Sequence, residues 1–255
     1  MPAQLVAALG NVLFVGAIMT ISIRLLLLWR RTRQWPELLI SSGFLLLALL
    51  GFPLLGLSGL AEPTIGAVHA PTLAIGLAAL AASIVLLHAF TWQVFRPHAS
   101  WARLFVLANA IAATAVAVLF LRAVVTAPPD SVSLEVHGPW SLAVRLLFQV
   151  WYVWVGIESL LEWSRARKRM ALGLSDPVSV NRFALWGSMG NVLALNGAVA
   201  MVLEARGMSP MNDALPAIWL GLNGAVAGVL MFLTFVPPAG YVEWIQRRHT
   251  ARAIT

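Results

Sequence analysis

The most constraining feature of this sequence is a series of seven long apolar runs. An α-helix needs about 20 apolar residues to cross the roughly 30 Å hydrocarbon core of a bilayer. The runs are continuous rather than alternating, which favours helices over the strands of a membrane β-barrel. The sequence therefore predicts an all-α integral membrane protein, a single seven-transmembrane-helix bundle over residues 1–255, with spans near 5–29, 37–57, 67–95, 101–126, 139–163, 180–204 and 214–236.

Composition agrees with a lipid environment. Hydrophobic residues make up 60% of the chain and charged residues 11%, whereas a soluble domain carries about 25% charged residues. A soluble fold of this length could not bury so much apolar surface. The chain contains no cysteine, which excludes disulfides, thiol catalysis and thiolate metal sites.

Basic residues are concentrated in the connections that follow the odd-numbered spans and in the tail after span 7. In membrane proteins such connections lie in the cytoplasm. We therefore expect an N-terminus outside, a cytoplasmic C-terminus, and a multi-pass location in the inner (plasma) membrane. This distribution also explains the net charge of +7 without nucleic-acid binding. The residues concerned are Arg30, Arg31, Arg33, Arg96, Arg103, Arg165, Arg167, Lys168, Arg169, Arg182, Arg247, Arg248 and Arg252.

The tail, residues 237–255, is too short for an output domain of its own. Pro237 and Pro238 end span 7, because proline lacks the amide hydrogen and clashes with the preceding turn. We expect the tail to lie along the cytoplasmic interface. A signal would then pass from the bundle to a separate protein.

Polar residues within membrane spans are costly and mark candidate functional sites. Arg145, Gln149 and Tyr152 are spaced i, i+4 and i+7, so they share one helix face in the outer half of span 5. One interpretation is an outward-open pocket in which Arg145 binds a small anionic ligand through a forked hydrogen bond. In the alternative, Arg145 snorkels toward the surface or pairs with a loop residue.

Two asparagines and two tryptophans belong to the same hypothesis. Asn196 and Asn223 lie at matching depth in spans 6 and 7. They either contribute to the ligand pocket or hydrogen-bond between helices. Trp151 and Trp154 either wall the pocket or pack in the core.

The inner half of the bundle contains a second polar pair. His88 in span 3 and Glu158 in span 5 lie at similar distances from the basic end of their spans. A histidine beside a buried carboxylate would form a possible proton site. The alternative is a structural hydrogen bond, or a Glu158 that faces the cytoplasmic headgroups.

We expect no cofactor and no catalytic residues. His69 and His137 lie in or near outer connections, but their spacing matches no metal motif. The only lysine, Lys168, lies in a loop, whereas a retinal Schiff base requires a buried lysine amine. No signature of an intramembrane enzyme is present.

Three short segments carry a family resemblance. They are 33–39 (RQWPELL), 173–186 (GLSDPVSVNRFALW) and 234–241 (TFVPPAGY), the last followed by Arg247 and Arg248. Together they resemble a loose group of bacterial seven-helix membrane proteins, some of which look like the input modules of sensor kinases and cyclases. The resemblance implies a seven-span architecture and a sensory role. We expect no output domain within this chain, which would be a departure from that group.

Three functions remain open from the sequence. The first is a ligand-sensing or signal-relaying membrane protein that acts through a membrane or cytoplasmic protein partner. The second is a small-solute or proton-coupled carrier, and the third is an accessory subunit of a larger membrane complex. Membrane lipids are expected partners in all three.

Overall fold

A computed structural model describes residues 2–60, 66–126, 134–208 and 213–253. Within these ranges the chain is almost entirely helical and contains no strand. Seven helices are long and apolar enough to cross a membrane, which confirms the predicted number of spans: Pro2–Thr32, Trp35–Leu55, Pro71–Phe95, Ser100–Thr126, Leu142–Ala171, Pro177–Ala205 and Ala214–Phe235.

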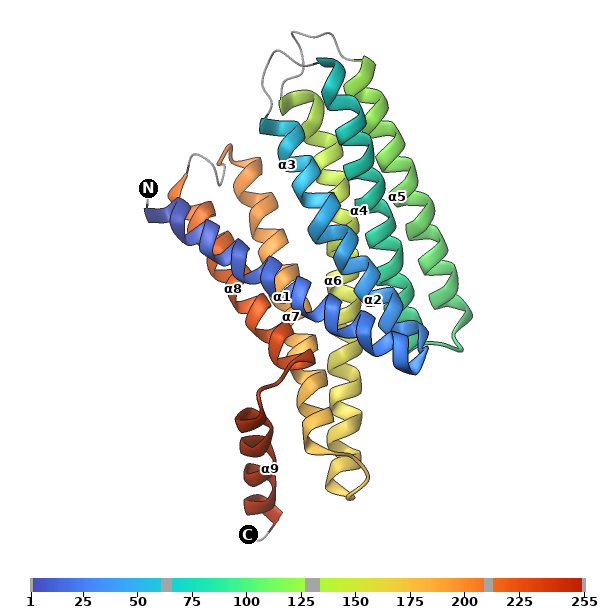
Figure 1. The fold of residues 1–255 in the computed structure, drawn as a ribbon, viewed down its shortest axis with the longest axis vertical. Helices are drawn as coiled ribbons and strands as arrows, with labels where there is room; N and C mark the ends of the chain where they lie inside the picture. The colour runs from blue at the N-terminus through green and yellow to red at the C-terminus, as the bar shows by residue number, and fades with distance from the viewer. Residues whose placement is uncertain (1, 61–65, 127–133, 209–212, 254–255) are drawn as a thin grey trace. The chain divides into compact units, whose positions relative to one another are not determined.

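The helices are shown in Figure 1 and follow one another with short connections. In chain order they are α1 (Pro2–Thr32), α2 (Trp35–Leu45), the π-helical segment η1 (Leu46–Gly51), α3 (Phe52–Leu60), α4 (Gly66–Phe95), α5 (Ser100–Thr126), α6 (Leu134–Ala171), α7 (Pro177–Ala205), α8 (Ala214–Phe235) and α9 (Ala239–Ala253).

Local sequence explains where the long helices begin and end. Asp176 caps the start of α7 by accepting a hydrogen bond from the Ser179 amide at 2.9 Å, and Pro177 occupies the first turn. Gly173, two residues after the end of α6, has a φ of 72°. The Gly173 amide donates to the Met170 carbonyl at 3.0 Å, so the last turn is satisfied by a glycine cap.

The chain divides into two compact units. The middle unit is Ser22–Trp151, and the terminal unit combines Met1–Ile21 with Tyr152–Thr255. Each unit is described separately below.

In the middle unit, α4 lies at the centre, in contact with α2, η1, α3 and α5. More than half of its apolar window, 56%, is buried, against 17–39% for the other six spans. Its buried face includes Leu80, Ile84 and Leu87. The π-helical segment lies against this face, since a Cβ on Gly51 would lie 2.6 Å from Leu80 Cδ2.

In the terminal unit, helices approach one another through glycine. A Cβ on Gly190 of α7 would lie 2.8 Å from the Gly156 Cα of α6. A Cβ on Gly221 of α8 would lie 2.8 Å from the Ala7 Cα of α1. Because these neighbours are backbone atoms, a larger side chain at either position would force the helices apart.

Candidate functional sites: buried polar residues and a basic extension

Trp151 forms a polar contact between α6 and α4 in the middle unit. Its indole Nε1 donates to the Leu87 carbonyl at 2.9 Å and to Thr91 Oγ1 at 3.0 Å. The side chain is only 2% exposed, and Phe44 packs edge-on against it with ring centroids 6.4 Å apart. A buried indole N–H needs an acceptor, and this one has two. These contacts favour core packing over a wall of a ligand pocket.

His88 lies one residue after Leu87 on α4 and is fully buried. Its Nδ1 is 2.8 Å from the Ile84 carbonyl oxygen, which can only accept, so Nδ1–H donates to it. The ring lies 6.0 Å from the ring of Phe105 on α5. His88 is therefore a buried polar side chain where α4 meets α5.

Glu158 on α6 is also buried, with 5% of its surface exposed. The next residue, Ser159, donates to the Val155 carbonyl at 2.6 Å. On α7, Asn191 donates to the Gly187 carbonyl at 2.8 Å and lies against Gly156. His88 and Glu158 belong to different units, so their pairing as a proton site stays a prediction.

Arg145, Gln149 and Tyr152 all lie on α6, which is continuous through them, so the predicted spacing along one helix face is confirmed. Arg145 is exposed, whereas Gln149 and Tyr152 are half-buried. Trp154, two residues after Tyr152, is buried. Whether this face binds an anion stays a prediction.

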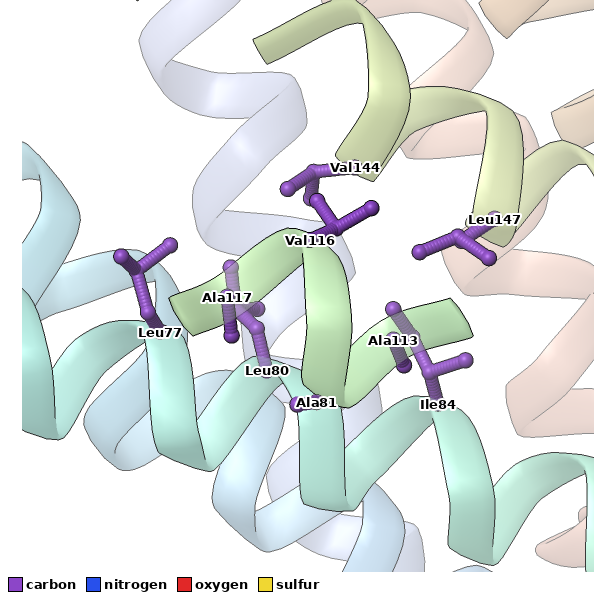
Figure 2. A pocket seen from close by; sticks show the side chains of 9 residues that line it. All are labelled: Leu77, Leu80, Ala81, Ile84, Ala113, Val116, Ala117, Val144 and Leu147. Carbon is purple, nitrogen blue, oxygen red and sulfur yellow. The ribbon is translucent and has the colours of Figure 1, made fainter. Parts of the chain in front are cut away.

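A small, partly open hollow of about 10 Å³ lies between α4, α5 and α6 in the middle unit (Figure 2). Its lining is entirely apolar: Leu77, Leu80, Ala81, Ile84, Ala113, Val116, Ala117, Val144 and Leu147. None of the predicted ligand-binding residues lines it. The hollow is far smaller than a ligand pocket, and its lining offers no polar group to an anion.

The two asparagines of α7 and α8 do not hydrogen-bond directly to each other. Asn223 Nδ2 donates to the Trp219 carbonyl of its own helix at 2.9 Å. Asn196 Oδ1 is buried with no hydrogen-bond partner among the described residues. The glycine beside Asn223 faces α1, since a Cβ on Gly224 would lie 3.3 Å from the Gly10 carbonyl oxygen. No direct hydrogen bond joins the two asparagines, and the expectation that they lie within direct or one-water reach of each other stays a prediction.

The basic ends of α6 and α7, together with α9, form a feature that we call the basic extension, residues 162–182 and 239–249. Asn181 Nδ2 donates to the Tyr241 hydroxyl at 3.0 Å, which joins α9 to the first turns of α7. Ile245 of α9 is buried. In Figure 1, α9 continues past the end of α8, in the direction in which α6 and α7 extend. The expectation of a tail along the membrane interface did not include this packing.

Stacked aromatic and cationic side chains cover the basic extension. The rings of Tyr241 and Trp244 are stacked with centroids 5.9 Å apart, and the Arg248 guanidinium lies 4.9 Å from the Trp244 ring. On α6, Arg167 lies 5.0 Å from the Trp163 ring. Each of these contacts attracts a guanidinium to an aromatic face, worth about 0.5–1 kcal/mol at an exposed site.

Acidic residues compensate only part of the charge of the basic extension. Glu162 pairs with Arg165 at 3.4 Å and with Arg169. Glu243 pairs with Arg247 at 3.6 Å. The sequence contains a signal that could have predicted the long end of α6. No glycine or proline separates the end of the apolar run from Gly173, so the helix can continue to that residue.

No group of three or more His, Asp or Glu residues is arranged to hold a metal ion in the part of the chain that the structure describes. The side chains of His69 and His137 lie outside the described residues. Comparison of the chain with protein families, with curated proteins and with solved structures gave no match.

Proposed function

We propose that this chain is a signal-relaying protein of the bacterial plasma membrane that acts on a separate protein partner. The observation that carries this proposal is the basic extension, a three-helix structure that continues past the apolar spans. Helices that only cross the bilayer do not need a basic extension. Its exposed side chains give a partner a surface to bind, and the resemblance to sensory input modules supports the same role.

The proposed orientation puts the N-terminus outside and the basic extension in the cytoplasm. The support is the concentration of Arg and Lys at one end of the spans. Because the chain lacks cysteine, a single Cys variant can be labelled without background. Leu174→Cys should react with a membrane-impermeant maleimide only after the cells are opened, and labelling of intact cells would reverse the orientation.

The proposed input is a small anionic ligand at the helix face of Arg145, Gln149 and Tyr152. The planar guanidinium recognises carboxylate by two parallel hydrogen bonds. Asn196, whose side-chain carbonyl oxygen is buried with no hydrogen-bond partner among the described residues, is a separate candidate for a polar contact with a ligand. Arg145→Gln should abolish the response while the purified protein keeps its thermal stability. A loss of stability with the response intact would assign Arg145 a structural role instead.

A second candidate function, a proton-coupled carrier, is favoured by one observation. Glu158 is an acidic residue with 5% exposure inside an apolar helix, and such residues line proton pathways in transporters. The two functions separate in proteoliposomes that contain this chain alone. A carrier acidifies or alkalinises the lumen, reported by a trapped pH dye, and loses this flux in Glu158→Gln. A relay gives no flux and copurifies with a partner at fixed stoichiometry.

A further inference from the structure

The far end of the basic extension carries two leucines in an unusual position. Leu172 and Leu174, in the turn between α6 and α7, are 74% and 72% exposed. Leucines on the spans are covered by lipid, so their exposure needs no other explanation. Lipid could cover Leu172 and Leu174 in the same way only if the turn between α6 and α7 reached the bilayer. The length of α6 decides whether it does.

The length of α6 puts these leucines beyond the bilayer. Residues 142–161 are predominantly apolar and rise about 30 Å, the thickness of the hydrocarbon core. The first charged side chain after them is Glu162, and the helix then continues to Ala171 for about 15 Å more. The headgroup layer on each side accounts for only about 5–8 Å of this length. Leu172 and Leu174 therefore lie in water unless a protein covers them.

The charge of the surroundings specifies what kind of protein fits. The described part of the basic extension holds seven cationic residues, Arg165, Arg167, Lys168, Arg169, Arg182, Arg247 and Arg248, but only three acidic ones, Glu162, Asp176 and Glu243. The two exposed leucines follow Arg167, Lys168 and Arg169 closely in the chain, so an apolar pair lies next to excess positive charge. A second copy of this chain would present the same positive charge and would be repelled.

The surface is held in shape before any partner binds. The Asn181–Tyr241 hydrogen bond fixes α9 to α7, and the glycine cap at Gly173 closes the turn that carries the leucines. A surface that is already ordered loses less conformational entropy on binding. This favours a docking platform over a loosely attached tail.

We propose that the basic extension is the docking surface for a soluble protein with an acidic face and a small apolar pocket, into which Leu172 and Leu174 insert. The inference rests on the proposed relay function and names the partner's chemistry. Arg167 and Lys168 attract the partner, and the leucines supply the apolar contact that keeps it bound.

The first test asks whether lipid covers the leucines. Single Cys variants Leu174→Cys and Ile157→Cys are labelled with a fluorophore and reconstituted in vesicles of phosphatidylcholine and phosphatidylglycerol with brominated acyl chains. Ile157, on the apolar part of α6 and 51% exposed, is the control that bromine should quench. The label at 174 should remain unquenched, and quenching there would overturn the proposal by making the membrane the occupant.

The second test identifies the partner's chemistry in the cells that produce the chain. A photo-crosslinking amino acid at Ala171 should give one discrete protein adduct, and the crosslinked segment should be acidic. The yield should fall at least tenfold in Arg167→Glu/Lys168→Glu and in Leu172→Asp/Leu174→Asp. The matched control, Arg30→Glu/Arg31→Glu, reverses the same charge at the basic end of α1 and should leave the yield unchanged.

The remaining outcomes each decide the question. An adduct with lipid, with a second copy of the chain, or with a protein whose capture ignores charge reversal contradicts the docking surface. If a stoichiometric partner still copurifies with the Arg167→Glu/Lys168→Glu chain, the relay function stands and the partner docks elsewhere. If no partner copurifies with the unmodified chain, the relay function fails as well.

Discussion

The two units differ in the atoms that meet at their best-defined helix contacts, which are large side chains in the middle unit and backbone atoms at glycine in the terminal unit. In the middle unit, Trp151 and Phe44 fill the space between helices, and the indole N–H bonds to α4. In the terminal unit, Gly156 and Gly190 let the backbones of α6 and α7 come within contact of each other.

The difference teaches how a membrane bundle gains stability without a hydrophobic driving force between helices. Lipid tails are as apolar as leucine, so association depends on close packing and on hydrogen bonds between helices. The middle unit uses a bulky donor that reaches a neighbouring carbonyl. The terminal unit uses close approach, which maximises dispersion contacts between backbones.

The largest effect is expected at Trp151. Trp151→Ala removes a buried ring and should lower the free energy of unfolding by about 3–5 kcal/mol. Trp151→Phe keeps most of the ring and loses only the N–H, so it should cost about 0.6–2 kcal/mol. Unfolding by denaturing detergent, followed by tryptophan fluorescence, measures both. Equal losses in the two variants would show that the hydrogen bonds, and not the packing, stabilise the middle unit.

Glycine at the contact of α1 and α8 should rank second. A Cβ on Gly221 would meet the backbone of Val6 and Ala7, which no side-chain rotation can relieve. Gly221→Ala should therefore cost about 1–3 kcal/mol. A Cβ on Gly16, on the same helix as Ala7, would meet nothing within 4 Å, so Gly16→Ala should be neutral or slightly stabilising. If Gly221→Ala left the free energy of unfolding unchanged, close approach of the helix backbones would not be what stabilises the terminal unit.

A smaller and local effect is expected at Tyr241. Tyr241→Phe removes the acceptor of the Asn181 amide and should weaken the attachment of α9 by about 0.5–1.5 kcal/mol. Hydrogen exchange should rise in residues 239–249 and stay unchanged in the spans. Gly240→Ala, with open space around its position, is the control. Exchange that rises throughout the terminal unit would mean that α9 is part of its core.

The smallest effect is expected at Asn196. Its Oδ1 has no hydrogen-bond partner among the described residues, so Asn196→Leu should change the free energy of unfolding by no more than about 0.5 kcal/mol. If the proposed ligand site includes Asn196, the response to ligand should fall nonetheless. A loss of stability comparable to that of Trp151→Phe would instead assign Asn196 a packing role between helices.

The ends of the helices show where sequence reasoning reached its limit. The predicted span 139–163 became α6, Leu134–Ala171, because a helix continues through Arg165 and Arg169 until a residue such as Gly173 ends it. The apolar pattern marks only the part in lipid. The sequence did not predict the π-helical segment Leu46–Gly51 within the span 37–57, because its side chains are as apolar as their neighbours.

The candidate sites divide in the same way. Spacing alone was enough to place Arg145, Gln149 and Tyr152 on one face of a continuous helix, because the helical period is a local property. Matching depth alone could not tell whether Asn196 and Asn223 bond directly, and in the structure no direct bond joins them. Depth specifies one coordinate of a side chain, and the rotation of each helix about its axis decides which neighbour it meets.

By itself, the sequence determined that this is a helical protein with seven spans, because apolar length and the solvation of the backbone are properties of each segment alone. Only the tertiary structure decided that Trp151 bonds to α4, that Gly221 meets α1, and that α9 joins α7 in a basic extension. Those contacts depend on which helix faces lie together. In lipid, that choice rests on close fit and a few hydrogen bonds between residues far apart in the chain.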